Sequence, residues 1–373
     1  MAYLGENIKK LGFGLMRLPM IGDEVDIEQF KQMADRFLEE GFTYFDTAYG
    51  YIGGKSEKAV KAALVDRHPR EAFTLATKLP AWAGAKTAEQ AQQMFYTSPE
   101  RTGAGYFDFY LLHNLGGART KSFDDFGIWD FVKARKAEGL IRHVGFSMHS
   151  TPEELEAVLQ RHPETDFVQL QITYADWDSE SIQSRRCYEV CRKYDKPVVI
   201  MEPVKGGNLA DLPESVASIF RAADPTVSQS SWALRYAASL DGLVTVLSGM
   251  STLAQMEDNL ATMKAFRPLD AQEREVIGEA VRALNAIEHI PCTGCEYCVK
   301  GCPMQINIPG AFSSMNFKLI YGNEKAAKGE YHWATLNRGK ATDCVACGQC
   351  EAACPQHIGI IEELKRVAAA LED

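Results

Sequence analysis

The chain has 373 residues, of which 46% are apolar and 24% charged. These proportions exclude a disordered chain, collagen and a long coiled coil, and no apolar run approaches the roughly 20 residues of a membrane-spanning helix. The net charge of −10 argues against a nucleic-acid surface. Because the N-terminus has no apolar signal core, we expect a cytoplasmic protein that binds neither nucleic acid nor membranes.

The cysteines divide the chain into two parts. Eight of the ten lie after residue 290. In a cytoplasmic chain of this size, such clustering indicates metal or redox chemistry rather than disulfides. We therefore predict one domain over residues 1–285 and a second over residues 286–373.

Short apolar runs rich in Val, Ile, Phe and Tyr alternate with amphipathic segments in the first part. Runs of this length and composition predict buried parallel strands, here at residues 11–18, 44–48, 73–78, 107–113, 143–149, 167–172, 198–203 and 243–248. Apolar residues spaced three and four apart predict helices at residues 26–40, 57–65, 87–97, 126–138, from 151 onward, 181–194, 226–239 and 253–264.

Capping residues fix the start of two of these helices. Ser56 is expected to cap the helix at 57–65. Thr151 precedes Pro152, a proline at the first helical position, and Glu154 is placed to complete a capping box with Thr151.

Eight strands alternating with eight helices predict parallel crossovers. A (β/α)8 TIM barrel fits both this count and the length of the first part. An open doubly wound sheet is the competing architecture, but no strand is followed by the phosphate-binding pattern G-x-G-x-x-G. We therefore predict an α/β protein with a TIM barrel in its first domain.

Polar residues stand at the ends of three neighbouring predicted strands. Asp46 opens D-T-A, Tyr51 follows five residues later, Lys78 ends the next strand, and His113 ends the strand after that in L-L-H. This set, in this chain order, resembles the catalytic tetrad of the aldo-keto reductase superfamily. The resemblance covers about residues 8–265 and implies an oxidoreductase that reduces a carbonyl group with a nicotinamide cofactor.

The chemistry of these residue types agrees with that resemblance. Carbonyl reduction needs a proton donor near the oxygen, and the pKa of a tyrosine is about 10. A nearby ammonium group stabilises the phenolate and lowers that pKa. The resemblance makes Tyr51 the acid, Lys78 its activator, Asp46 the partner of Lys78, and His113 the residue that orients the carbonyl oxygen. Taken singly, a buried Asp–Lys pair or a strand-end histidine is more often structural.

The resemblance also names positions that contact the cofactor. Asp46 belongs both to the tetrad and to the cofactor site. Gln171, two residues after Gln169 on the same predicted strand, is an alternative to Gln169. The implied contacts follow strands one, five, six, seven and eight of the barrel: Gly14, Leu15, Met16, Ser147, Gln169, Met201, Gly249, Gln255 and Asn259.

Three departures from the family pattern bear on the cofactor. Met148 stands where an Asn often follows the serine. Met201 stands where an aromatic ring usually stacks on the nicotinamide, and a thioether packs on that nicotinamide less specifically than an aromatic ring does. Gly249, Met250 and Gln255 occupy places that commonly hold Lys, Ser and Arg in members that bind a 2′-phosphate. Because Arg fits phosphate best, the choice between NADP and NAD stays open.

The second part repeats one cysteine pattern. C-x2-C-x2-C-x3-C-P occurs at residues 292–303 and again at 344–355. This is the spacing of two-cluster ferredoxins, in which the fourth cysteine ligates the other cluster. Zinc ribbons use paired C-x2-C units instead. We predict two [4Fe–4S] clusters, one on Cys292, Cys295, Cys298 and Cys354, the other on Cys344, Cys347, Cys350 and Cys302.

The spacer between the two motifs has helical patterns at residues 310–321 and 324–335. The tail therefore resembles a small, mainly helical ferredoxin-like domain, and the whole chain an iron–sulfur-linked subfamily of aldo-keto reductases. Cys187 and Cys191, four apart on one predicted helix, have two interpretations: a redox pair, or small core residues. The core interpretation is preferred.

Three functions are compatible with these motifs. The first is an NAD(P)H-dependent reductase of a small-molecule carbonyl compound, an aldehyde, ketone or enone, whose clusters are structural or serve electron transfer. The second is an electron-transfer protein that couples a barrel-bound organic cofactor to a one-electron redox protein. The third is a redox-sensing module. The presence of all four tetrad residue types argues against the third. We favour the first and keep the second as its alternative.

Overall fold

The computed structural model describes residues 4–372. The chain forms two compact units, which are described separately. The first comprises the chain up to Asp178 with Ile182–Gly206 and Ser230–Ala271, and the second comprises Ser179–Ser181, Gly207–Gln229 and the chain from Gln272 onward. A domain boundary after residue 285 stays a prediction.

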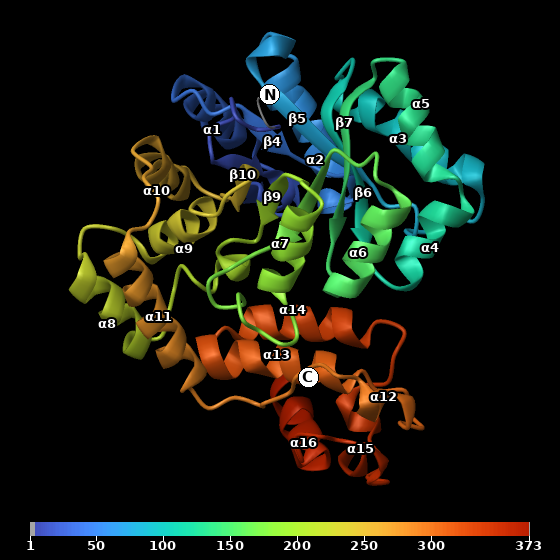
Figure 1. The fold of residues 1–373 in the computed structure, drawn as a ribbon, viewed down its shortest axis with the longest axis vertical. Coiled ribbons are helices and arrows are strands. Elements are labelled where there is room, and N and C mark those ends of the chain that lie inside the picture. Colours follow the sequence, from blue (N-terminus) through green and yellow to red (C-terminus); the bar gives the residue numbers. More distant parts are fainter. Residues whose placement is uncertain (1–3, 373) are drawn as a thin grey trace. The chain divides into compact units, whose positions relative to one another are not determined.

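The first unit is a closed barrel of parallel strands with helices outside it (Figure 1), which confirms the predicted TIM barrel. Going round the barrel, the strand order is β1-β10-β9-β8-β7-β6-β5-β4. All the strands expected from the sequence are present, at Gly12–Gly14 (β1), Tyr44–Asp46 (β4), Thr74–Leu79 (β5), Phe107–Leu115 (β6), Ile141–Met148 (β7), Phe167–Gln171 (β8), Val198–Met201 (β9) and Leu243–Gly249 (β10).

The first strand is shorter than predicted. Strand β1 ends at Gly14, and Leu15–Arg17 forms a turn of 3-10 helix (η1). A two-stranded hairpin follows, Met20–Ile21 (β2) paired with Glu24–Val25 (β3), which the sequence analysis did not anticipate. Strand β1 therefore contributes a short segment between β4 and β10, and the chain leaves the barrel directly after Gly14.

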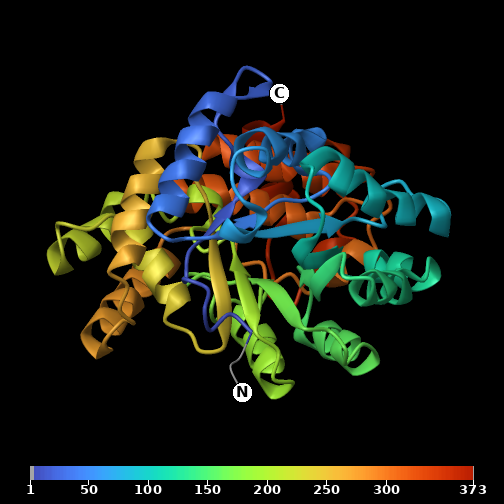
Figure 2. The same ribbon diagram turned by 90° about the horizontal axis from the view of Figure 1, so that it is seen from above.

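Helices outside the barrel follow the predicted alternation (Figure 2). The helices of the first unit are Ile27–Glu39 (α1), Lys55–Val60 (α2) with its continuation Lys61–Val65 (η3), Ala88–Thr102 (α3), Ala118–Asp125 (α4), Ile128–Ala137 (α5), Pro152–Arg161 (α6), Ser184–Lys193 (α7), Gln229–Ala238 (α9) and Leu253–Lys264 (α10). Helix α4 was not expected, and within residues 4–372 the second unit adds five further helices that were not expected.

The barrel has apolar side chains on both faces of its strands. Tyr44, Phe109, Phe167 and Val199 belong to one buried cluster drawn from the strands alone. A second and larger cluster joins the opposite strand faces to the helices, with Phe13 against Phe30 and Phe37 of α1 as one example. Strands buried on both faces explain why continuous apolar runs predicted them.

Two capping predictions need correction. Ser56 lies inside α2 rather than before it, because its buried hydroxyl hydrogen-bonds with Thr47 and donates to the carbonyl of Leu15. Thr151 caps α6 as predicted, accepting from the N–H of Glu154. The Glu154 carboxylate does not close the capping box, because it accepts instead from Gly117 and Thr120.

The second unit is mainly helical. Its apolar core includes Phe312, Ile360 and Leu364 together with Cys298 and Cys350. Helices at residues 310–321 and 324–335 are confirmed, and the unit holds Glu214–Ala223 (α8), Ala271–Asn285 (α11), Tyr297–Lys300 (α12), Ile308–Tyr321 (α13), Glu324–Thr335 (α14), Gln349–Ala352 (α15) and Ile360–Leu371 (α16). Within residues 4–372, no helix has both the length and the apolar character needed to cross a membrane.

Candidate functional site

Three charged or ionisable side chains meet at the carboxyl ends of neighbouring strands β4, β5 and β6. Asp46 is the last residue of β4, Lys78 lies in β5, and His113 lies in β6. The Lys78 ammonium forms an ion pair with the Asp46 carboxylate and donates to the carbonyl of Thr47 at 2.8 Å. Both side chains of this ion pair are buried, so the cation is fixed in place.

Tyr51 joins this group from the turn after β4. The Lys78 ammonium lies 4.8 Å from the centroid of the Tyr51 ring. The Tyr51 and His113 rings meet edge to face, with centroids 5.7 Å apart. Ile52 and Gly53, at φ values of 51° and 61°, turn the chain sharply after Tyr51. The structure thus brings together all four residues of the predicted tetrad.

Burial strengthens the preference of the Tyr51 hydroxyl for its protonated form. It raises the pKa of the Tyr51 hydroxyl above 10.0, and the opposing attraction of Lys78 does not reverse this shift. The influence of Lys78 on this pKa has the predicted direction, but burial outweighs it. Burial also disfavours a charge on Lys78, but Asp46 and Tyr51 together raise the pKa of Lys78 above 10.5. At neutral pH the site holds a phenol beside an ammonium group.

His113 is a neutral imidazole. Burial, and next the charge of Lys78, hold the pKa of His113 well below 6.5. Its Nδ1 is buried and has no hydrogen-bond partner within residues 4–372. The Trp82 indole donates to the His113 carbonyl at 2.7 Å, which fixes the backbone of the strand end. A neutral ring beside Tyr51 is able to hold a carbonyl oxygen without competing for its proton.

A second polar group projects from the adjoining strands. Gln169 of β8 is buried, and its side-chain N–H donates to the Met201 sulfur of β9 at 3.3 Å. Its Oε1 has no partner in the described part of the chain. Ser147 Oγ accepts from the N–H of Asn114 at 2.8 Å. Gln171 is instead engaged with His149 at 3.2 Å, so Gln169 and not Gln171 offers a buried, unpartnered amide oxygen.

The predicted adenosine segment forms the turn between β10 and α10. Gln255 accepts from the N–H of Ser251 at 2.8 Å, and Asn259 donates to the Ser248 hydroxyl at 2.9 Å. Both side chains therefore stabilise this turn. Gly249 pairs with Gly14 across β10 and β1. Next to Gly14, Leu15 is fully buried, whereas Met16 is 54% exposed.

The cysteines of the second unit surround two pockets. One pocket is lined by Cys292, Cys295, Cys298 and Cys354. The other is lined by Cys302, Cys344, Cys347 and Cys350. In each case three cysteines of one motif face the fourth cysteine of the other motif, which is the grouping expected from the sequence. Four thiolates around one pocket are the donor set that a [4Fe–4S] cluster requires.

Comparison with known families decides the identity of both parts. The sequence model of the Aldo/keto reductase family matches residues 10–282. The chain belongs to this family. The model of the 4Fe-4S dicluster domain matches residues 291–358. The protein is therefore an oxidoreductase of the aldo/keto reductase family that carries a C-terminal iron–sulfur domain.

Individual relatives agree with this assignment. An uncharacterized oxidoreductase of Bacillus subtilis, YqkF, is 23% identical over 290 residues, which cover 70% of this chain and 89% of that protein. An aldo-keto reductase of Mycolicibacterium smegmatis is 29% identical over 145 residues, covering 38% of this chain and about half of that protein, 48%.

Solved structures share the barrel. The holo form of the aldo-keto reductase AKR11C1 from Bacillus halodurans superposes with a TM-score of 0.62 at 26% identity, covering 76% of this chain and 96% of that one. An aldo/keto reductase from Klebsiella pneumoniae, solved with NADP and acetate, has a TM-score of 0.58 at 20% identity and covers 74% of this chain and 92% of that one.

The barrel of this aldo/keto reductase also contains a support network that the sequence analysis missed. Glu57 of α2 is fully buried and accepts from the Thr77 hydroxyl at 2.8 Å. Arg101 of α3 reaches Glu57 at 3.2 Å and donates to the carbonyl of Tyr49 at 2.8 Å. Its guanidinium also covers the Tyr49 ring. The sequence signal for this network was Glu57, an acid on the apolar face of the helix predicted at residues 57–65.

Arg17 is a second residue that the sequence analysis missed. Its side chain is exposed, and its Cβ lies 3.8 Å from the position that a Cβ on Gly249 would occupy. A guanidinium nitrogen of Arg17 lies 3.4 Å from the corresponding position on Gly206. Arg17 thus places a positive charge beside Gly206, in the segment that follows β9.

Cys187 and Cys191 behave as core residues. Both are buried in the cluster between the strands and the helices. Burial raises the pKa of the Cys187 thiol to about 11 and raises that of Cys191 further still. Thiols so far from ionisation are poor nucleophiles and poor ligands, which supports the preferred structural interpretation.

Proposed function

We propose that this protein is an NAD(P)H-dependent reductase of a small carbonyl compound, an aldehyde, ketone or enone. The observation that carries the proposal is the convergence of Tyr51, Lys78, Asp46 and His113 at one end of the barrel. TIM-barrel enzymes hold their active sites at the carboxyl ends of the strands. Membership of the aldo/keto reductase family supports the same chemistry.

Each tetrad residue has a distinct role in this proposal. Tyr51, protonated at neutral pH, transfers its hydroxyl proton to the carbonyl oxygen. The Lys78 ammonium stabilises the phenolate that remains, and Asp46 holds Lys78 charged and in position. His113 is neutral and donates a hydrogen bond that orients the carbonyl oxygen. A nicotinamide, when bound, supplies the hydride.

The residues around the tetrad fit a nicotinamide. The unpartnered Gln169 Oε1 is suited to accept from a carboxamide N–H, and the Ser147 hydroxyl is suited to donate to its oxygen. Met201 lies against Gln169 and offers an apolar surface for a ring. We propose further backbone or side-chain contacts from Gly14, Leu15, Met16, Gly249, Gln255 and Asn259.

We propose that Arg17 faces the cofactor phosphates. Phosphate sites of TIM barrels frequently lie at the loops after the seventh and eighth strands, which here are β9 and β10. The Arg17 guanidinium, beside Gly206 in the segment after β9, supplies the cation that Gly249 and Gln255 do not. Whether the cofactor is NADPH or NADH is decided by the experiment below.

The second unit is proposed to hold two [4Fe–4S] clusters. Cys292, Cys295, Cys298 and Cys354 are proposed to bind one cluster, and Cys302, Cys344, Cys347 and Cys350 the other, because each set lines one pocket. A cluster exchanges one electron at a time, whereas a nicotinamide transfers two as hydride. We propose that the clusters exchange electrons with a small one-electron redox protein.

Anaerobic absorption spectroscopy of iron-reconstituted protein tests these assignments together. We expect NADH or NADPH to be oxidised when an aldehyde is added, with the preferred nucleotide identified by its lower KM. Oxidation that stops when the clusters are removed without unfolding the barrel would favour the electron-transfer alternative. Absence of nucleotide binding, measured by fluorescence, would contradict the proposed function.

A further inference from the structure

Arg119 lies beside the tetrad and has no assigned role. It is the second residue of α4, just after the strand that carries His113. Its Nε donates to the carbonyl of Asn114 at 2.8 Å, one residue beyond His113. One terminal nitrogen lies 2.9 Å from the position that a Cβ on Gly116 would occupy, so the guanidinium packs closely against this turn. The side chain is half-buried.

The guanidinium of Arg119 stands apart from the carboxylates of residues 4–372. Among residues 4–372, no acidic oxygen lies within ion-pair distance of Arg119, and its terminal nitrogens donate to no described group. Glu154 is the acid whose charge acts on Arg119, but its oxygens accept hydrogen bonds from Gly117, Thr120 and Ser150. Burial lowers the pKa of Arg119 more than the attraction of Glu154 raises it.

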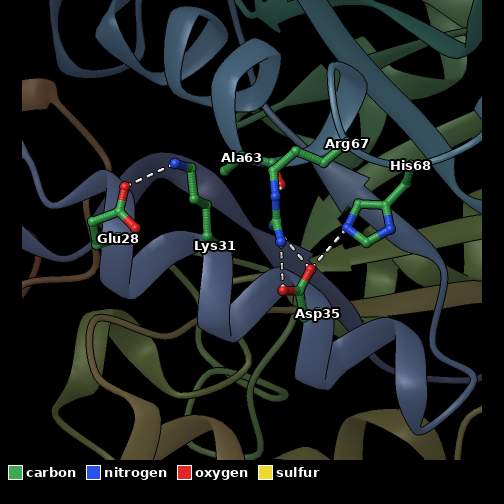
Figure 3. Close-up of polar contacts among 6 residues, drawn as sticks. All are labelled: Glu28, Lys31, Asp35, Ala63, Arg67 and His68. Carbon is green, nitrogen blue, oxygen red and sulfur yellow. Dashed lines mark hydrogen bonds and ion pairs between the residues drawn. The ribbon is translucent and has the colours of Figure 1, made fainter.

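Arg67 on the outer layer of the same barrel shows the ordinary arrangement. Its guanidinium holds the Asp35 carboxylate with two hydrogen bonds of 2.9 and 2.7 Å, and His68 contacts the same carboxylate at 2.8 Å (Figure 3). Arg67 is thus satisfied within the fold. Arg119 keeps both terminal nitrogens available for an external partner.

The position of Arg119 also has a structural cost. The first turn of a helix favours negative charges and disfavours cations, yet Arg119 is held in the first turn of α4. Asn114 adopts a left-handed conformation, φ 59°, and its buried Oδ1 has no partner in the described chain. The buried Nδ1 of His113 also lacks one. Strain and unpartnered polar atoms of this kind gather at functional sites.

We propose that Arg119 binds an anionic group of the substrate, and that the substrate is a carbonyl compound carrying a carboxylate. The fork of a guanidinium binds a carboxylate through two parallel hydrogen bonds. Because Arg119 is anchored next to His113, the bound carboxylate directs the carbonyl toward Tyr51. This inference rests on the proposed reduction and adds the substrate class to it.

Matched substrates test the inference. We measure the steady-state reduction of para-carboxybenzaldehyde and of its methyl ester. The proteins compared are wild type, Arg119→Met, Arg119→Lys and Arg67→Met. Succinic semialdehyde and its methyl ester form a second, flexible pair of substrates. We expect Arg119→Met to lower kcat/KM for the acids by about 10- to 100-fold and for the esters by less than about threefold. Arg119→Lys recovers part of the loss, and Arg67→Met, the matched control, changes neither.

A second measurement separates this inference from the proposed reduction. Benzoate binding is followed by calorimetry without turnover, and we expect Arg119→Met to weaken it and Arg67→Met to leave it unchanged. Equal selectivity for acid and ester in wild type and Arg119→Met, with benzoate binding unchanged, overturns the anion site while reduction stands. Arg119-dependent benzoate binding in a protein that reduces neither pair supports the anion site and contradicts the proposed reduction.

Discussion

At the scale of single residues, the site depends on a competition between burial and charge. Burial raises the pKa of Tyr51 despite the nearby Lys78, and it lowers the pKa of His113 with help from Lys78. The proton donor therefore stays protonated, and the histidine stays neutral, over the same range of pH. The motif in the sequence identifies these residues, but the outcome of the competition depends on how deeply the fold buries them.

This competition predicts a flat pH profile. Reduction requires protonated Tyr51, so its rate falls only as pH rises through a pKa that lies above 10.0. Protonation of His113 requires a pH well below 6.5. We expect kcat for reduction, at saturating nucleotide, to be constant between these limits. A titration step near neutral pH that disappears in His113→Asn would contradict the assigned neutral imidazole.

At the scale of elements, the chain shows which features a sequence reveals. The strands were predicted because each is buried on both faces and reads as a continuous apolar run. Helix α4 was missed because its buried residues are only Thr120 and Phe123, which leave no apolar periodicity. Ser56 was misplaced because a serine at a helix start usually caps it, whereas here the hydroxyl is needed inside the barrel wall.

The link between α2, α3 and the turn that carries Tyr51 gives an element-scale prediction. Arg101→Met leaves the Glu57 carboxylate buried without its cation, and such a loss costs about 3–5 kcal/mol. It also frees the Tyr49 carbonyl, so we expect reduction to slow as well. Denaturant unfolding measures the first effect and steady-state kinetics the second.

Arg67→Met is the matched control for Arg101→Met. The Arg67–Asp35 pair is about one-third exposed, with side-chain exposures of 32% and 35%. Exposed pairs contribute about 0–1 kcal/mol, and bidentate ones such as this contribute more than single contacts, but less than a buried pair. We expect a small change in unfolding free energy and unchanged reduction. Equal losses of stability in the two variants would show that Glu57 does not depend on Arg101.

At the scale of the whole molecule, a barrel and an iron–sulfur unit are joined in one chain. The cysteine spacing predicted both the number of motifs and the exchange of their fourth cysteines, and the two pockets have that composition. Spacing identifies such sites well because a cluster needs several thiolates on short turns. The contacts of Glu57 with Thr77 and Arg101 join residues distant in sequence, so no short motif reveals them. The Arg119 contact with Asn114 is local, and it depends on the backbone of the turn rather than on a motif.

Double variants test the exchange of the fourth cysteines. Cys292→Ser with Cys354→Ser removes two ligands of the same proposed cluster, so we expect about half of the wild-type iron and one remaining cluster signal. Cys292→Ser with Cys302→Ser removes one ligand from each cluster, and we expect both to be lost. Iron analysis and electron paramagnetic resonance provide the readout. The reverse pattern would show that each motif binds its own cluster.

Single-turnover reduction by Tyr51→Phe tests the central claim most directly. The substitution removes one hydroxyl and leaves the ring against Lys78 and His113. We predict that hydride transfer to an aldehyde slows by about 10²-fold or more, while nucleotide affinity measured by fluorescence stays within about twofold, because no cofactor contact is assigned to the hydroxyl. Transfer at the wild-type rate, with nucleotide bound, would contradict the role of Tyr51 as the proton donor.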